Sequence, residues 1–221
     1  MSWVSRPLNS SIGCKVIMSV SGLLLVGFLL AHLSGNLLVF AGEEAINLYA
    51  KTLRDYLPIL WLLRIGLIVM AVLHIFSGIK LTRMNQKAKP VKYKVSQSVK
   101  ASFASRYMGL TGVVVLAFIF YHLAHLTFRF THPAFQSLGD YDVYKMLMLS
   151  FSSPLLAMSY CICVVLLMVH LSHGVSSLFQ TLGLNHSKYN GLIRTLGPAL
   201  STLLAIGYLS IPLSIMFGLI K

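Results

Sequence analysis

The sequence contains few charged residues, very few acids and few cysteines. Charged side chains make up 10% of the 221 residues, and only five are acidic against 18 lysines and arginines, for a formal net charge of +13. No charged residue occurs from Met146 to Ser187. Soluble globular domains carry about 25% charged residues, so this composition excludes an ordinary soluble fold. The three cysteines, Cys14, Cys161 and Cys163, form no metal-ligand pattern, and we expect them to be small packing residues.

Long apolar segments account for most of the chain. Hydrophobic residues reach 57%, the mean hydropathy is +0.79, and a helix that crosses a membrane needs about 20 such residues. Five segments are long enough: Val16–Phe40, Pro58–Ile79, Tyr107–Phe128, Pro154–Leu182 and Pro198–Ile220. The first is too long for a signal peptide and is expected to be a retained helix. We therefore predict an all-α integral membrane protein with a single domain over residues 1–221, in which four helices form a core and a fifth packs outside it.

The basic residues are concentrated between the second and third predicted helices. Residues 80–106 hold lysines and arginines without an acid, whereas all the acids lie after the first and third helices. Positive charge marks the cytoplasmic side of a membrane protein. This bias predicts a cytoplasmic N-terminus, cytoplasmic loops at 80–106 and 183–197, and a C-terminus outside. It also argues against a nucleic-acid partner, because the charge serves to set the topology.

Histidines recur at matched depths in the predicted helices. At about 1.5 Å per residue, His32 lies roughly 25 Å beyond Lys15, and His122 roughly 24 Å beyond Arg106. Both therefore lie near the outer side. The next helices run inward from prolines, which suit a helix start, and His74 and His170 each come 16 residues after their proline. Four histidines thus form two pairs, one near each side of the membrane.

A glycine follows each inner histidine by four residues, in HIFSG (74–78) and HLSHG (170–174), and Gly35 similarly follows His32. A glycine one turn along the same face leaves room for a bulky planar group. The first two and the next two histidine-bearing helices therefore form a weak parallel repeat.

Two histidines at one depth on facing helices suit bis-imidazole ligation of haem iron, which also offsets the cost of placing imidazole in lipid. With both axial positions filled, the remaining chemistry is one-electron transfer. The alternative for any single histidine is a hydrogen bond to a neighbouring helix. His125 and His173, three residues further on, are alternative ligands, but His122 and His170 fit the 16-residue spacing better.

Several segments resemble one family of membrane proteins over nearly the whole chain. They are SVSGLLLVGFLLAHL (19–33), GEEAINLY (42–49), VLHIFSGIK (72–80), SRYMGLTG (105–112), FYHL (120–123) and VHLSHG (169–174). With them the chain resembles the dihaem cytochrome b membrane-anchor subunits of succinate:quinone oxidoreductases, which include succinate dehydrogenases and fumarate reductases.

The resemblance implies two haem b groups, the outer bound by His32 and His122 and the inner by His74 and His170. It implies a flavoprotein and an iron–sulfur subunit as partners at the cytoplasmic face of a bacterial inner membrane. The dicarboxylate chemistry would belong to the flavoprotein, and this chain would pass electrons between the iron–sulfur subunit and a membrane quinone, menaquinone, in the respiratory chain.

Other polar residues fit this scheme. Arg64 and Arg106 are candidate partners of the outer and inner haem propionates, with ordinary interfacial arginines as the alternative. Glu43, Glu44 and Asn47 are candidates for a quinone site at the outer end, where a proton donor or acceptor is needed, with a solvated loop as the alternative.

One residue departs from the pattern of the family. Some fumarate reductases carry a glutamate two residues before the fourth-helix ligand, linked to proton movement; here Met168 takes that place and cannot relay a proton.

Two other functions stay open. One alternative function is the dihaem cytochrome b anchor of another quinone-linked complex, such as a hydrogenase or formate dehydrogenase. The other is a haem-free transporter whose histidines relay protons.

Overall fold

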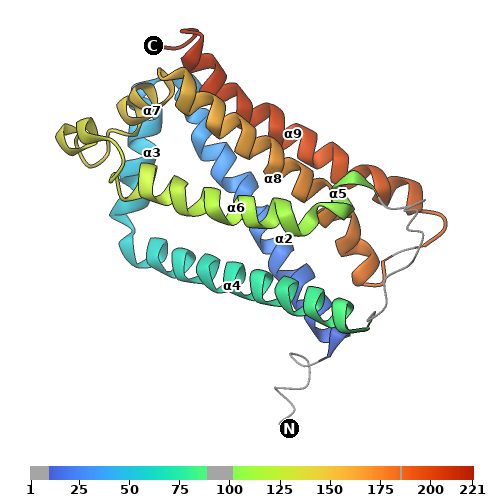
Figure 1. Cartoon of the computed structure of the whole chain (residues 1–221). Helices are drawn as coiled ribbons and strands as arrows, with labels where there is room; N and C mark the ends of the chain where they lie inside the picture. The colour runs from blue at the N-terminus through green and yellow to red at the C-terminus, as the bar shows by residue number, and fades with distance from the viewer. Residues whose placement is uncertain (1–9, 89–101, 185) are drawn as a thin grey trace.

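The computed structural model describes residues 10–88, 102–184 and 186–221 (Figure 1). This part of the chain contains helices and no strand. Its elements are α2 (Ser11–Asn36), η1 (Leu37–Ala41), α3 (Glu43–Asp55), α4 (Leu57–Ala88), α5 (Phe103–Arg106), α6 (Met108–His122), η2 (Leu123–Thr127), η3 (Pro133–Ser137), α7 (Val143–Phe151), α8 (Pro154–Thr181) and α9 (Asn190–Met216).

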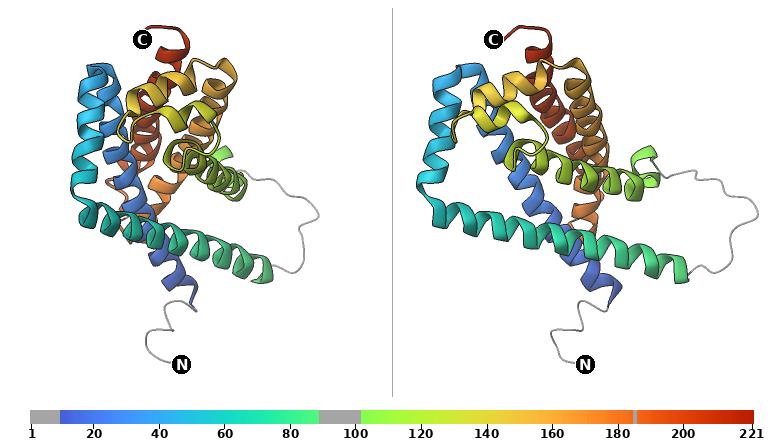
Figure 2. Two further views of the ribbon diagram at one scale, coloured as in Figure 1. Left: turned by 90° about the vertical axis from the view of Figure 1, so that its left-hand side faces the viewer. Right: turned by 60° about the vertical axis from the view of Figure 1, so that its left-hand side comes forward.

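Five of these segments are long and apolar enough to cross a membrane, namely α2 with η1, α4, α6 with η2, α8 and α9. Each corresponds to one predicted span, so the prediction of an all-α, multi-pass membrane protein is confirmed. α2 begins and α9 ends at opposite ends of the bundle, as an odd number of spans requires (Figure 2). The lysines Lys89, Lys92, Lys94 and Lys100 of the predicted cytoplasmic loop lie outside the described residues.

Proline marks one helix start correctly and another wrongly. α8 begins at Pro154, as predicted, where the missing N–H of proline costs no helical hydrogen bond. The predicted start of the last span at Pro198 is wrong, because α9 begins at Asn190 and contains both Pro198 and Pro212. Membrane helices tolerate internal proline where neighbouring helices and hydroxyl groups supply the lost contacts.

The helices that carry the histidines pack as two pairs. α4 packs across α2, α6 packs across α8, and α8 also contacts α2, so that α8 and α2 connect the pairs (Figures 1 and 2). Each pair joins helices that are consecutive among the spans, which is the repeat that the sequence predicts.

α9 lies along α8 on the side away from α4, outside the four histidine-bearing helices, yet it packs closely (Figure 2). Leu204 of α9 is fully buried in a cluster with Val26 and Leu33 of α2 and with Val164, Met168 and Leu171 of α8. A Cβ atom on Gly207 would lie 2.6 Å from a methyl group of Leu33. The fifth helix therefore completes the core that holds α2 against α8.

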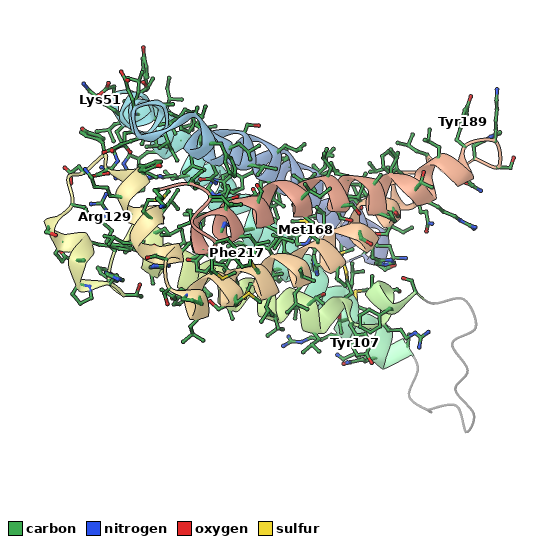
Figure 3. All side chains as sticks on the ribbon, turned by 90° about the horizontal axis from the view of Figure 1, so that it is seen from above. Lys51, Tyr107, Arg129, Met168, Tyr189 and Phe217 are labelled. Atoms are coloured by element: carbon green, nitrogen blue, oxygen red, sulfur yellow. The ribbon has the colours of Figure 1, made fainter. Side chains whose placement is uncertain are left out.

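The short helices α3 and α7, which were expected to be loops, cover one end of the bundle. Lys51 on α3 and Arg129 lie at this end, opposite Tyr107 and Tyr189 (Figure 3). α3 buries Ile46, and α7 buries four residues, Met146, Leu147, Ser150 and Phe151. The buried apolar cluster at this end joins α3, α7, α8 and α9.

Candidate functional site

The structure brings the predicted inner histidines together. The ring centroids of His74 on α4 and His170 on α8 lie 6.4 Å apart, with the ring planes at 67°. Both side chains are partly buried. α4 and α8 are not consecutive among the spans, so the contact between these rings joins the two halves of the repeat.

The predicted outer histidines also form a pair. His32 on α2 and His122 at the end of α6 have ring centroids 6.0 Å apart and planes at 88°. Aromatic rings surround them: Phe28 stacks on His32 at 5.2 Å, while Phe118 and Tyr160 lie 5.8 and 6.0 Å from His122. Tyr208 of α9, with its ring 6.3 Å from His32, was not identified from the sequence as a neighbour of this pair.

The two pairs lie at levels separated by about 15 Å along the helices. A Cβ atom on Gly22 would touch the ring of His74, and His32 comes ten residues later on the same helix. A Cβ atom on Gly112 would touch the ring of His170, and His122 again comes ten residues later. Ten residues of α-helix rise about 15 Å. The matching depths inferred from the sequence are therefore reproduced by two separate helices.

The spacing of each pair fits one metal ion held between two imidazoles. A bond from a metal to an imidazole nitrogen is about 2 Å long, which places the ring centroid roughly 3 Å from the metal. Two imidazoles on opposite sides of one ion then have centroids about 6 Å apart, close to the separations in both pairs. His122 Nδ1 is buried and has no hydrogen-bond partner among the described residues.

The inner rings are held through their Nδ1 atoms. His74 Nδ1 lies 3.2 Å from the carbonyl oxygen of Met18, and His170 Nδ1 lies 3.2 Å from Thr111 Oγ1. These contacts leave the opposite ring nitrogen, Nε2, for a ligand. Metal-binding histidines typically have this arrangement, in which the second nitrogen donates to a carbonyl or hydroxyl.

His125 is engaged through both nitrogens in a buried hydrogen-bond chain. Its side chain is 1% exposed; Nδ1 lies 2.7 Å from the Tyr160 hydroxyl and Nε2 lies 3.3 Å from Ser150 Oγ. Ser150 donates its only hydroxyl hydrogen to the Met146 carbonyl and therefore accepts from Nε2–H. Nδ1 must then accept from Tyr160. These contacts favour His122 over His125 as the outer ligand.

The backbone explains why the side chains of His122 and His125 point to different partners. His122 is the last residue of α6, and His125 lies in the π-helical turn η2. Residues three apart share a face in a regular α-helix, but a π turn shifts the register of the following residues. At the other level, the ring that meets His74 belongs to His170, while His173 is partly buried one turn further along.

The glycines near the histidines serve different contacts. A Cβ atom on Gly78 would meet no heavy atom within 4 Å, and one on Gly174 would meet only Met108 Cε, at 3.6 Å. Both are consistent with glycines that leave room beside the inner pair. Gly35 instead allows close approach of the Tyr49 ring, which a Cβ atom would approach to 2.6 Å. The analogy drawn between Gly35 and the inner glycines is therefore wrong.

The two candidate propionate partners lie on different helices. The Arg64 guanidinium lies over the Trp61 ring of the same helix, 5.3 Å from its centroid, and is partly exposed. Arg106 ends the short helix α5 and is exposed. Their roles toward haem stay predictions.

The candidate quinone residues connect α3 to α7. Lys145 Nζ lies 3.1 Å from a carboxylate oxygen of both Glu43 and Asp142. The Asn47 side chain donates to Asp142 and accepts from the backbone N–H of Tyr144. Burial raises the pKa of Asp142, but hydrogen bonds from Lys145 and Asn47 and the lysine charge outweigh it and lower the pKa overall. Glu44 is exposed. This arrangement favours the alternative of a solvated face.

A cleft of about 340 Å³ opens between α6 and α8 beside the outer pair. Its lining is mainly apolar and comprises Val114, Ala117, Phe118, Tyr121, Ser159, Tyr160 and Cys163. Phe118 and Tyr160 also contact the His122 ring. This cleft could not be predicted from the sequence, because it depends on how α6 and α8 cross.

Comparison of the chain with models of protein families, with curated proteins and with solved structures gives no match. The function of the chain is therefore inferred from the geometry of its histidines and from the resemblance of its sequence segments.

Proposed function

We propose that this chain is the membrane anchor and electron-transfer subunit of a succinate:quinone oxidoreductase, with two haem b groups held by paired histidines. The observation that supports it is the spacing of the pairs, 6.0 Å for His32 with His122 and 6.4 Å for His74 with His170. Each pair comes from two helices, and the two pairs lie about 15 Å apart along the helix axes.

Haem b at each pair would supply a one-electron carrier. His32 and His122 would hold one haem and His74 and His170 the other, which would leave neither iron open to oxygen or a substrate. Aromatic side chains lie beside both His32 and His122 at the outer level. The two levels form a path for charge through the hydrocarbon layer.

The orientation follows from charge. The C-terminal part of α4 carries the basic residues Lys80, Arg83 and Lys87. The opposite end of the bundle carries the acids Glu43, Asp140 and Asp142. By the positive-inside rule the His74–His170 level faces the cytoplasm of a bacterial inner membrane. In this proposal an iron–sulfur subunit and a flavoprotein that interconverts succinate and fumarate dock at that face.

Quinone, as menaquinone, would react at the outer level. The cleft between α6 and α8 is mainly apolar, and two of the residues that line it, Phe118 and Tyr160, also contact His122. Ligand sites are typically apolar clefts with a few polar groups, here from Tyr121 and Ser159. We therefore place the quinone beside the outer pair in preference to the α3–α7 contact.

The test is the reduced-minus-oxidised absorption spectrum of the detergent-purified chain, with haem counted by the pyridine haemochrome method. We expect two haem b per chain, loss of one haem in His74→Ala, and loss of the other in His32→Ala. A colourless protein would overturn the proposal and favour the transporter. Copurification with a flavoprotein, with succinate-dependent quinone reduction, would separate it from anchors of nickel or molybdenum enzymes.

A further inference from the structure

One five-residue pattern occurs twice beside the inner histidines. Residues 18–22 read MSVSG on α2, and residues 108–112 read MGLTG on α6. They share a methionine, a hydroxyl residue three positions later and a glycine after it. Each segment packs against the histidine of the next long helix, so the pattern marks the same place in both halves of the repeat.

The α2 segment holds His74 through three neighbouring groups. His74 Nδ1 lies 3.2 Å from the Met18 carbonyl oxygen and 3.5 Å from Ser21 Oγ. The Ser21 hydroxyl lies 2.6 Å from the Ile17 carbonyl, to which it donates, so it can only accept from the imidazole. A Cβ atom on Gly22 would lie 3.2 Å from His74 Cε1, and a side chain there would push the ring away.

The α6 segment repeats this arrangement for His170. His170 Nδ1 lies 3.2 Å from Thr111 Oγ1, and the backbone of Met108 lies beside the same side chain. The Thr111 hydroxyl donates to the backbone carbonyls of Tyr107 and Met108 one turn back, both at 3.1 Å, and so accepts from the ring. A Cβ atom on Gly112 would lie 3.3 Å from His170 Cε1.

These contacts determine the tautomer of both rings. A carbonyl oxygen can only accept a hydrogen bond, and both hydroxyl hydrogens are already donated. Nδ1 of each histidine must therefore carry the proton, which leaves the Nε2 lone pair for a ligand. Hydrogen bonding at Nδ1–H also makes the imidazole a more basic ligand.

Resting on the function proposed above, we infer that Ser21 and Thr111 are positioning residues that set the reduction potential of the inner haem through the Nδ1 atoms of His74 and His170. A more basic imidazole stabilises ferric over ferrous iron and lowers the potential. Thr111 has the larger effect, because its oxygen lies 3.2 Å from Nδ1, against 3.5 Å for Ser21. The outer pair has no such support at His122, whose Nδ1 has no partner among the described residues.

A purely structural role for these hydroxyls is the competing explanation. Serine and threonine in membrane helices often bond to the carbonyl one turn back, as Thr82 does with Gly78 on α4. Ser21 and Thr111 differ from Thr82 in facing a histidine of another helix. Thr82→Val is therefore the matched control for Thr111→Val.

The experiment is a potentiometric titration of both haems in the purified chain, with electron paramagnetic resonance of each ferric haem. His74→Ala identifies the signals of the inner haem by removing them. We expect Thr111→Val to raise the inner potential, with the ferric-to-ferrous ratio changing about threefold, or about 30 mV at 59 mV per tenfold change. Ser21→Ala should give a smaller rise, while Thr111→Ser and Thr82→Val should leave both potentials unchanged.

Loss of the inner haem alone in Thr111→Val would favour the structural role and count against the inference. Equal shifts of both haems, an unchanged inner potential in Thr111→Val and Ser21→Ala, or loss of both haems would overturn it. Absence of haem from the unmodified protein would instead overturn the proposed function.

Discussion

Replacing His125 by phenylalanine separates a structural histidine from a haem ligand. The ring size is nearly kept, so the change removes two nitrogens without opening a cavity. Tyr160 loses the acceptor 2.7 Å from its hydroxyl, whereas Ser150 keeps its bond to the Met146 carbonyl. A buried group left unsatisfied costs about 1–3 kcal/mol, so His125→Phe should lower thermal stability and retain both haems.

The loss of stability expected for His125→Phe can be checked with a second substitution. Tyr160→Phe removes the hydroxyl that His125→Phe leaves unsatisfied. Removing both partners of a buried hydrogen bond costs less than removing one, so the double variant should recover part of the loss. The assay is thermal unfolding of the purified protein followed by the haem absorbance, with haem counted in each variant.

The matched variant is His122→Phe, which should lose the outer haem while the Tyr160–His125 contact stays intact. The assignment is refuted if His125→Phe loses one haem and His122→Phe keeps both.

Three further changes test the packing and the outer end. Gly197→Ala would drive a methyl group into the Ser172 carbonyl where α9 meets α8, and overpacking of this kind costs about 1–3 kcal/mol, measured as a lower unfolding temperature. Lys145→Met should leave the unfolding temperature nearly unchanged at neutral pH, because both ion pairs of Lys145 are exposed to solvent. The pKa of Asp142 is lower in the folded than in the unfolded chain, so ionised Asp142 stabilises the fold at pH values above the ordinary aspartate pKa. This stabilisation is lost as the pH falls through the pKa of the folded state. The loss should be visible as a lower unfolding temperature at acid pH. Met168→Gln would bury an amide in the core and cost about 1–3 kcal/mol, with haem content and electron transfer unchanged (Figure 3).

Each of these changes has a control or a contrary outcome. Gly66→Ala adds the same methyl group where no atom lies within 4 Å and should be neutral. An acid-dependent loss of stability that is as large in Asp142→Asn as in the parent would assign the effect to another group. A large loss of electron transfer in Met168→Gln with full haem content would show that this position does more than pack.

The sequence predicts the spans and the pairing of histidines because both depend on rise along a helix. The depth of a histidine follows from the number of residues between it and an anchor residue at the helix end. This count can be made for α2, α4, α6 and α8 without knowing how the helices pack. The start of α9 could not be found in this way, since Pro198 is a start signal in water but is tolerated inside a packed membrane helix. The short helices α3 and α7 have only 13 and 9 residues, and α3 is also polar, so neither stands out from loops by hydropathy.

The choice between His122 and His125 depends on tertiary contacts. Sequence spacing leaves them three residues apart on one predicted face, and the π turn and the partners Tyr160 and Ser150 separate their roles. The hydroxyl contacts of the inner pair were also missed, although a signal was present. MSVSG and MGLTG share three positions at equivalent places in the repeat, and a search for matches between the two halves would have found them.

The repeat also explains how two levels arise from one helix design. On α2, Gly22 faces His74 of α4, and ten residues later His32 faces His122 of α6. Ten residues turn an α-helix by 280° beyond two full turns, roughly 80° short of a third, so these groups lie on adjacent faces. α6 uses the same interval between Gly112 and His122. Each of these helices therefore supports the inner histidine of the next helix and supplies an outer histidine itself, which fixes both the number of levels and their separation.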